Sequence, residues 1–114
     1  MTQSLDGRVA LVTGGSRGIG FAIASALVSE GAHVAITGRD EGHLADARER
    51  LSGKGAGSVE SFQTDVRYWA ETERTVAAVV AKFGGLDLLV NNAGVGTFVD
   101  VASMTPAQWS EIID

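Results

Sequence analysis

The sequence predicts an α/β fold with one parallel sheet. Short apolar runs alternate with longer segments in which apolar residues recur at helical spacing. No hairpin signal stands between the apolar runs, so helices in right-handed crossovers are expected to join consecutive strands. The 114 residues, 45% hydrophobic and 20% charged, can bury one modest core. We therefore expect a single domain over residues 1–114, with about four strands and flanking helices.

Four strands are expected where apolar residues are continuous or nearly so. The first run is uninterrupted, which is typical of a strand that is covered on both faces. The expected strands are Val9–Val12, His33–Thr37, Val59–Thr64 and Leu86–Val90.

The three connecting helices each show an apolar face and an end signal. Apolar residues within Ile19–Leu27 follow helical spacing, and Gly31 is placed to end that helix. Asp40 can cap a second helix, which a glycine-rich stretch ends. A third helix is expected from about Glu71 to Phe83, with Gly84 as its stop.

The C-terminal segment starts a further helix. Thr105 can serve as the N-cap, Pro106 fits the first helical position, and Gln108 completes a capping box. No glycine, basic last turn or other end signal follows before Asp114. We expect the sequence to stop inside this helix, which leaves the domain incomplete at its C-terminus.

Composition excludes several classes of function. With no cysteine, the chain can form neither a disulfide nor a thiolate metal site. His33 and His43 lack partners at metal or triad spacing, so no metal is expected. A net charge of -5 with scattered arginines argues against a nucleic-acid surface, and no apolar run approaches the roughly 18 residues of a membrane helix. We therefore expect a cytoplasmic protein without nucleic-acid or membrane partners, in which any redox chemistry comes from a cofactor.

The segment Leu11–Gly20, LVTGGSRGIG, joins the first strand to the first helix and is rich in glycine. In a parallel sheet, ligands bind beyond the carboxyl ends of the strands, where such loops meet helix N-termini. Glycines there permit a tight turn and a close backbone approach to a pyrophosphate, and the helix dipole attracts anionic oxygens. A dinucleotide is the natural ligand of such a loop. The alternative is a glycine-rich turn that binds nothing, because glycine spacing alone is a weak signal.

Two further motifs follow the glycine-rich loop along the chain. The loop has the spacing Thr13-Gly14-x-x-x-Gly18-x-Gly20, the pair DV begins at Asp65, and NNAG begins at Asn91. The order and spacing of the three motifs resemble the short-chain dehydrogenase/reductase family, and the resemblance covers the whole chain. It implies a Rossmann-like, doubly wound parallel sheet.

The resemblance also implies roles for individual residues. The loop glycines would shape the pyrophosphate site, and the backbone of Ile19 would touch the phosphates. Asp65 and Val66 would lie at the adenine, and the NNAG residues would border the nicotinamide ribose. Asp65 and the asparagines could instead be turn residues that satisfy local backbone groups. The expected cofactor site consists of Gly14, Ser16, Arg17, Gly18, Ile19, Gly20, Arg39, Asp65, Val66, Asn92, Ala93 and Gly94.

The end of the second strand indicates which dinucleotide is bound. NAD sites usually place a carboxylate there for the ribose hydroxyls, whereas a 2′-phosphate needs positive charge. The expected acidic position is Gly38, Arg39 follows it, and Arg17 supplies a second guanidinium. Two arginines can make charge-assisted contacts with a phosphate, so NADP(H) is favoured over NAD(H). The alternatives are that both arginines are solvated surface residues, or that Asp40 reaches the ribose instead of capping a helix.

The catalytic groups of the resembled family are missing from this sequence. That family uses a serine with a Tyr-x-x-x-Lys motif, and the only tyrosine, Tyr68, has Thr72 four residues on. Ser103 precedes the last helix, whereas the family's serine follows a later strand. We therefore assign no catalytic residue. The resemblance implies an NADP-dependent oxidoreductase that reduces a ketone or aldehyde, or oxidises the alcohol, while this chain alone binds cofactor without turnover.

Other interpretations of the chain stay open. It could be a non-catalytic nucleotide-binding or interaction module, or a fragment retained as a folded half. In the resembled family the fourth strand is interior, so Leu86–Val90 would become an exposed apolar edge here. We therefore expect self-association through that strand, and a small carbonyl or alcohol substrate only for a complete parent protein.

Overall fold

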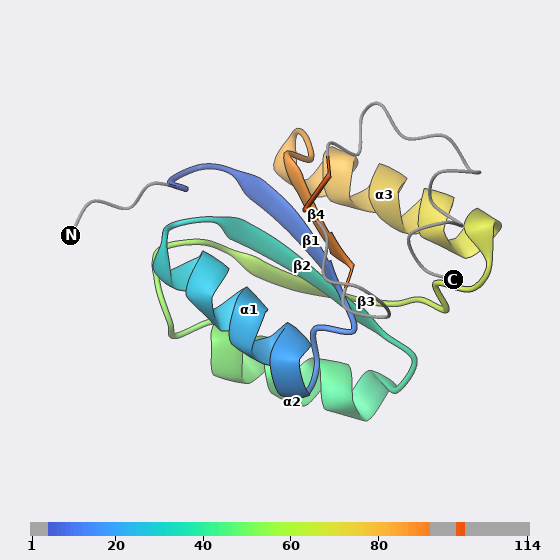
Figure 1. Ribbon diagram of the computed structural model, residues 1–114, viewed down its shortest axis with the longest axis horizontal. Coiled ribbons are helices and arrows are strands. Elements are labelled where there is room, and N and C mark those ends of the chain that lie inside the picture. The colour runs from blue at the N-terminus through green and yellow to red at the C-terminus, as the bar shows by residue number, and fades with distance from the viewer. Residues whose placement is uncertain (1–4, 92–97, 100–114) are drawn as a thin grey trace.

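The computed structural model describes residues 5–91 and 98–99, which form an α/β structure around one sheet (Figure 1). The strands are β1 (Val9–Thr13), β2 (His33–Gly38), β3 (Val59–Gln63), β4 (Leu88–Asn91) and β5 (Phe98–Val99). Their order across the sheet is β3-β2-β1-β4-β5. Strands β1 to β4 run parallel, which confirms the predicted four-stranded parallel sheet, and β5 lies antiparallel to β4.

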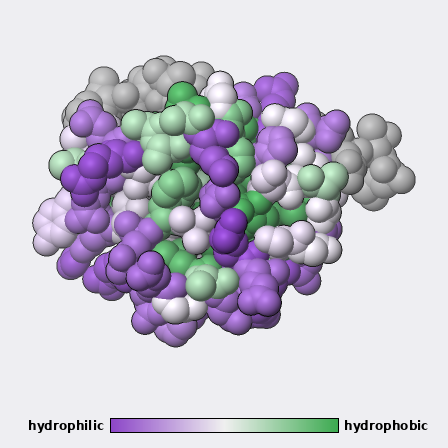
Figure 2. Space-filling model, turned by 180° about the vertical axis from the view of Figure 1, so that it is seen from behind, coloured by the Kyte–Doolittle hydropathy of each residue, from purple (hydrophilic) through white to green (hydrophobic). Residues whose placement is uncertain are grey.

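Helices cover both faces of the sheet, so the predicted doubly wound arrangement is confirmed (Figure 1). They are α1 (Gly18–Ser29), α2 (Glu41–Leu51) and α3 (Trp69–Phe83). Helices α1 and α2 lie on one side of the sheet and α3 lies on the other. Seen from behind, apolar side chains gather in a band through the middle of the molecule, with hydrophilic ones on both sides of it and below it (Figure 2). This distribution matches an apolar sheet layer between two helical layers.

Alternate residues of β1 point into two apolar clusters. Ala10 and Val12 pack with residues of α1 and α2, whereas Val9 and Leu11 pack with α3. All residues of β1 are buried. This explains the continuous apolar run in the sequence, because a central strand of a doubly wound sheet has no solvent-facing side.

The helix ends agree with most of the expected signals. Asp40 accepts a hydrogen bond from His43 N at 2.9 Å and caps α2. Gly84 follows α3 with φ 87°, in the left-handed region that glycine enters without a steric penalty. Helix α3 begins at Trp69, slightly before the predicted start, and its N-cap residue Tyr68 makes no side-chain cap hydrogen bond.

Strand β4 begins at Leu88, although the apolar run predicts a start at Leu86. Asp87 explains the difference. Its backbone N–H donates to Val9 O at 2.9 Å, and its carboxylate accepts from Val9 N at 2.9 Å. The Asp87 side chain thus replaces a backbone acceptor of the ladder, so regular pairing with β1 starts only at Leu88, opposite Ala10.

Strand β5, which the sequence pattern does not predict, changes the outer edge of β4. Leu89 pairs with Val99, and Val90 pairs with Phe98. The expectation of an unpaired edge over Leu86–Val90 is therefore wrong at Leu89 and Val90, because a short antiparallel strand takes up their side of the sheet. Self-association through β4 stays a prediction.

Some predicted features lie outside the described residues. They are the last helix, over 105–114, and the expected cofactor residues Asn92, Ala93 and Gly94. Within the part of the chain that the structure describes, no helix combines the length and apolar character needed to cross a membrane. Residues 5–91 and 98–99 also include no cluster of three or more His, Cys, Asp or Glu side chains that could hold a metal ion.

Candidate cofactor-binding site

The loop between β1 and α1 has the unusual backbone that its glycines suggest. Gly14 has φ 66° and Gly18 has φ 60°, both in the left-handed region. Gly15 lies against β2: its N–H donates to Thr37 O at 3.2 Å, and a Cβ atom there would lie 2.5 Å from Ile36 Cγ2. The loop is thereby fixed at the carboxyl edge of the sheet, where ligands of doubly wound folds bind.

The first turn of α1 offers a favourable environment for an anion. The helix begins after Arg17, whose backbone is extended and whose side chain makes no cap hydrogen bond. No acidic residue lies in that turn, so none opposes the positive end of the helix dipole. Gly20 is buried, whereas Ile19 is 72% exposed. Backbone N–H groups in such a turn can hold phosphate oxygens.

Ser16 and Gly38 meet where β2 ends. A Cβ atom at Gly38 would lie 3.4 Å from Ser16 Oγ and 3.3 Å from Leu44 Cδ2. The absence of a side chain at Gly38 thus lets Ser16 and Leu44 lie close to its backbone, and Arg39 is exposed directly after it. Gln63 fixes the backbone here, because Gln63 Nε2 donates to Arg39 O at 3.0 Å. An anionic group bound at the end of β2 would meet a hydroxyl donor and a nearby cation.

Asp40, the alternative residue for the ribose, serves as the cap of α2. The backbone hydrogen bond from His43 lowers the pKa of the Asp40 carboxyl, and the charge of Arg17 acts in the same direction. The cap interpretation of Asp40 is therefore confirmed.

A surface cavity of about 290 Å³ opens beyond the carboxyl end of β3. Its lining residues are Arg39, Gln63, Thr64, Asp65 and Glu71. Arg39 brings a positive charge to this cavity, and two carboxylates bring negative charge. Since neighbouring parallel strands end at the same edge of a sheet, the residues after β2 and β3 come together here. The structure thus joins Arg39 and Asp65, which the sequence assigns to different parts of a dinucleotide.

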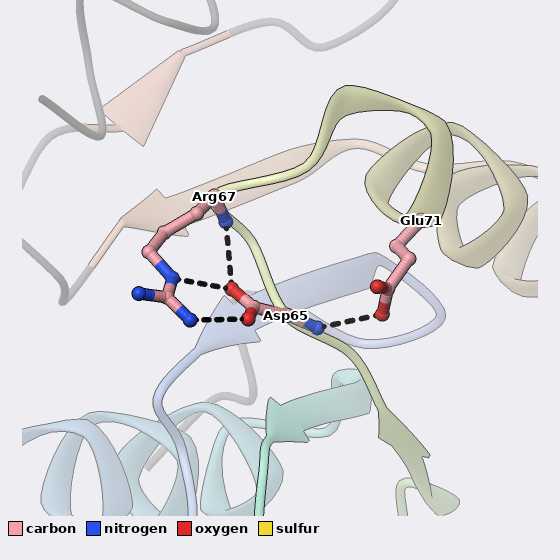
Figure 3. Close-up of polar contacts among 3 residues, drawn as sticks. All are labelled: Asp65, Arg67 and Glu71. Carbon is pink, nitrogen blue, oxygen red and sulfur yellow. Dashed lines mark hydrogen bonds and ion pairs between the residues drawn. The ribbon is translucent and has the colours of Figure 1, made fainter.

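Asp65 is held from two sides (Figure 3). The Arg67 guanidinium donates to both carboxylate oxygens, from Nε to Oδ1 at 3.0 Å and from Nη2 to Oδ2 at 2.7 Å. Arg67 N also donates to Oδ1, at 3.1 Å, and Asp65 N donates to Glu71 Oε1 at 3.0 Å. Hydrogen bonds from the Arg67 side chain lower the pKa of the Asp65 carboxyl to about 2, and the Arg39 charge adds to this effect.

Replacing Arg67 with alanine should raise the pKa of Asp65 from about 2 toward the usual 3.8, because the forked hydrogen bonds are lost. A carboxyl whose pKa is lowered by folding stabilises the folded chain above its unfolded pKa. That contribution disappears as the pH falls from about 4 to about 2, through the folded pKa. Carboxyl ¹³C shifts followed by NMR measure both values. An Asp65 pKa that is the same with and without the Arg67 side chain would contradict the fork, which is the pair of hydrogen bonds from the Arg67 guanidinium to the two Asp65 carboxylate oxygens.

The sequence reasoning missed Arg67 and Glu71. Glu71 is in the first turn of α3, where a carboxylate commonly accepts a hydrogen bond from a backbone N–H that precedes the helix. Its position in the sequence could therefore have indicated this contact. Arg67 carried no comparable signal, because its contact depends on a side-chain rotamer. Val66, which the resemblance places at the adenine, is partly buried and packs against the apolar cluster beneath α3.

The fold and the site define a doubly wound α/β protein with a glycine-rich loop and opposed charges at the carboxyl ends of its strands. The family model described as short chain dehydrogenase matches residues 8–114. This chain belongs to that family, so the resemblance seen in the sequence is confirmed.

Similar proteins are longer than this chain. The (5R,7aS)-5-hydroxy-7a-methyl-1-oxo-2,3,5,6,7,7a-hexahydro-1H-indene-carboxyl-CoA reductase of Mycobacterium tuberculosis is 40% identical over 111 residues, covering 96% of this chain and 42% of that protein. L-Sorbose reductase from Gluconobacter frateurii, solved with NADPH and L-sorbose, matches with TM-score 0.76 and 35% identity over 96% of this chain and 42% of that one. The Pseudomonas aeruginosa RhlG/NADP complex matches with TM-score 0.72 and 46% identity, covering 81% of this chain and 36% of that one. This chain therefore spans less than half the length of these relatives.

Proposed function

We propose that this chain is the cofactor-binding portion of an NADP(H)-dependent oxidoreductase that reduces a ketone or aldehyde, or oxidises the corresponding alcohol. The observation that carries the proposal is the end of β2. Gly38 supplies no carboxylate, Ser16 Oγ lies beside it, and Arg39 follows it. A phosphate monoester carries about two negative charges and three acceptor oxygens, which suits a hydroxyl and guanidinium donors. Similar proteins that were solved with NADPH and with NADP support the assignment.

The residues present fit this cofactor. The close packing of Gly15 on β2 brings the loop backbone to the sheet edge, as a pyrophosphate site requires. When bound, the cofactor supplies or accepts the hydride. We propose that the first turn of α1 holds the pyrophosphate, the two arginines hold the 2′-phosphate, and the residues after β3 and β4 border the adenine and the nicotinamide ribose. This set is Gly14, Ser16, Arg17, Gly18, Ile19, Gly20, Arg39, Asp65, Val66, Asn92, Ala93 and Gly94.

These 114 residues are proposed to bind the cofactor without turnover. Hydride transfer to a carbonyl leaves an alkoxide, which needs a positioned proton donor. Tyr68, the only tyrosine, is the N-cap residue of α3 and has no lysine four residues on. We therefore assign the carbonyl chemistry to a longer parent protein. Reduction of small ketones or aldehydes by this chain with NADPH would contradict the assignment.

Calorimetric titration with NADPH and NADH tests the choice of cofactor. The unaltered chain should bind NADPH more tightly than NADH. Arg39→Ala should weaken NADPH binding about tenfold and NADH binding less than about threefold, because only NADPH places a phosphate at the end of β2. The matched control is Arg50→Ala, which removes an exposed arginine whose guanidinium lies 4.6 Å from the Phe21 ring centre. Equal losses for both cofactors with Arg39→Ala would overturn the assignment of the 2′-phosphate site.

A further inference from the structure

Asp65 presents a restricted set of acceptor positions. An ionised carboxylate has about four lone-pair positions, two on each oxygen. Oδ1 accepts from both Arg67 N and Arg67 Nε, whereas Oδ2 accepts from Arg67 Nη2. Oδ1 is therefore filled, and Oδ2 retains about one position for another donor.

Arg67 reaches this carboxylate from outside the cavity. Asp65 and Glu71 belong to the cavity lining, and Arg67 is not among the described residues that line it. Arg67 and Glu71 lie on opposite sides of Asp65 (Figure 3). The Asp65 side chain is 18% exposed and that of Arg67 is 66% exposed, as expected for a guanidinium on the outer side of the pair. A ligand in the cavity can therefore meet Asp65 without breaking the fork.

The segment between β3 and α3 is held in place around this pair. Tyr68 N donates to Asp65 O at 3.1 Å, and the Arg67 guanidinium carbon lies 5.7 Å from the centre of the Tyr68 ring. Thr64 Oγ1 lies 2.6 Å from Thr75 Oγ1, which ties the end of β3 to α3. The Tyr68 N–H, the threonine pair and the contact of Asp65 N with Glu71 brace the backbone that carries Asp65 without the Arg67 side chain. Loss of that side chain should change the orientation of the carboxylate more than the position of the segment.

We propose that Arg67 is a positioning residue for base recognition: it fixes Asp65 as a single acceptor, so that the cavity selects a purine with an exocyclic amino group over its oxo counterpart. This rests on the proposed function, in which Asp65 lies at the adenine. The adenine amino group can donate to Oδ2, whereas the corresponding oxygen of hypoxanthine only accepts and faces an ionised carboxylate. A carboxylate that can turn is able to accept from the N1–H of hypoxanthine instead. Removing Arg67 should therefore reduce the selectivity for adenine.

The test compares the binding of NADPH with that of its hypoxanthine analogue by calorimetry. The unaltered chain should prefer NADPH about tenfold, and Arg67→Ala should reduce this preference to below about threefold. Arg67→Lys should behave like alanine in this ratio, because an ammonium group keeps the charge but cannot form the fork. Arg74→Ala is the matched control: it removes an exposed arginine from α3 that makes none of the Asp65 contacts, and it should leave the ratio unchanged.

The outcomes separate this inference from the proposed function. If the unaltered chain binds NADPH but Arg67→Ala and Arg67→Lys keep the full preference for adenine, the positioning role is overturned and the cofactor site stands. Equal weakening of both ligands by these variants would show a structural role for Arg67 and also overturn the inference. Failure of the unaltered chain to bind NADPH would overturn both proposals. Circular dichroism shows whether each variant folds. If Arg67→Ala does not fold, the selectivity of Arg67→Lys tests the positioning role.

Discussion

Replacing Gly38 with aspartate is expected to reverse the cofactor preference from NADPH to NADH. The new carboxylate would stand at the end of β2, where it can accept hydrogen bonds from the ribose hydroxyls of NADH and repel a 2′-phosphate. The new Cβ atom would be a tight contact, 3.3 Å from Leu44 Cδ2 and 3.4 Å from Leu44 Cγ and Ser16 Oγ, so these side chains must shift by a few tenths of an ångström to admit it. We expect the ratio of the two affinities to change about 100-fold, or about 2.7 kcal/mol.

Two variants separate charge from shape in this experiment. Gly38→Asn has nearly the same shape as aspartate but no charge, and Gly38→Ala adds only the Cβ atom. If charge decides, both should retain a preference for NADPH, with at most a modest loss of affinity. If Gly38→Asn loses as much NADPH affinity as Gly38→Asp, the volume of the new side chain causes the loss and its charge does not. Equal weakening of both cofactors by aspartate would place the 2′-phosphate elsewhere.

The fold follows from the sequence where local pattern determines burial. The uninterrupted run of β1 predicts a strand that is covered on both faces, and all of β1 is buried. Gly84 predicts a helix end, and its φ of 87° confirms why glycine stands there. Strand β5 could not be predicted in this way, because only two residues form it. Their pairing with Leu89 and Val90 depends on the tertiary structure and not on the local sequence pattern. The start of β4 depends on the Asp87 side chain, which apolar pattern does not reveal.

For the site, the sequence locates the loops and the structure supplies the contacts between them. Arg39 is predicted from its place at a strand end and Asp65 from the family resemblance, and the parallel sheet brings both to one cavity. Asp40 has two possible roles in the sequence, and the hydrogen bond from His43 N to its Oδ1 shows the role of helix cap. The fork of Arg67 on Asp65 is invisible in a one-dimensional pattern, because an arginine two residues after an aspartate can equally point to solvent.

Gly15→Ala should destabilise the chain and weaken NADPH binding together. Its Cβ atom would lie 2.5 Å from Ile36 Cγ2 and 2.8 Å from Ile36 Cβ. Ile36 is fully buried on β2, which pairs with β1 on one side and β3 on the other, so it cannot move away cheaply. Overpacking of this kind costs about 1–3 kcal/mol of unfolding free energy. Relief of the clash also requires the loop to shift from the sheet edge, which should lower NADPH affinity.

Two glycines provide matched controls for this substitution in urea unfolding. A Cβ atom at Gly18 meets no atom within 4 Å, but the residue has φ 60°, so alanine should cost about 1 kcal/mol from backbone strain alone. A Cβ atom at Gly53 also meets no atom within 4 Å, and its φ is not positive, so alanine should be neutral or slightly stabilising. A cost at Gly15 no larger than that at Gly53 would contradict the close packing of the loop.

A double substitution distinguishes the clash from a general loss of glycine flexibility. Ile36→Ala alone should cost about 2–5 kcal/mol, because it leaves a cavity in the core. If the loss at Gly15 comes from contact with Ile36, the Gly15→Ala/Ile36→Ala pair should lose less than the sum of the single changes, since the new methyl group occupies part of that cavity. Backbone entropy predicts simple addition instead. A recovery of NADPH affinity in the double variant would then connect the packing of one glycine on β2 directly to the geometry of the phosphate loop.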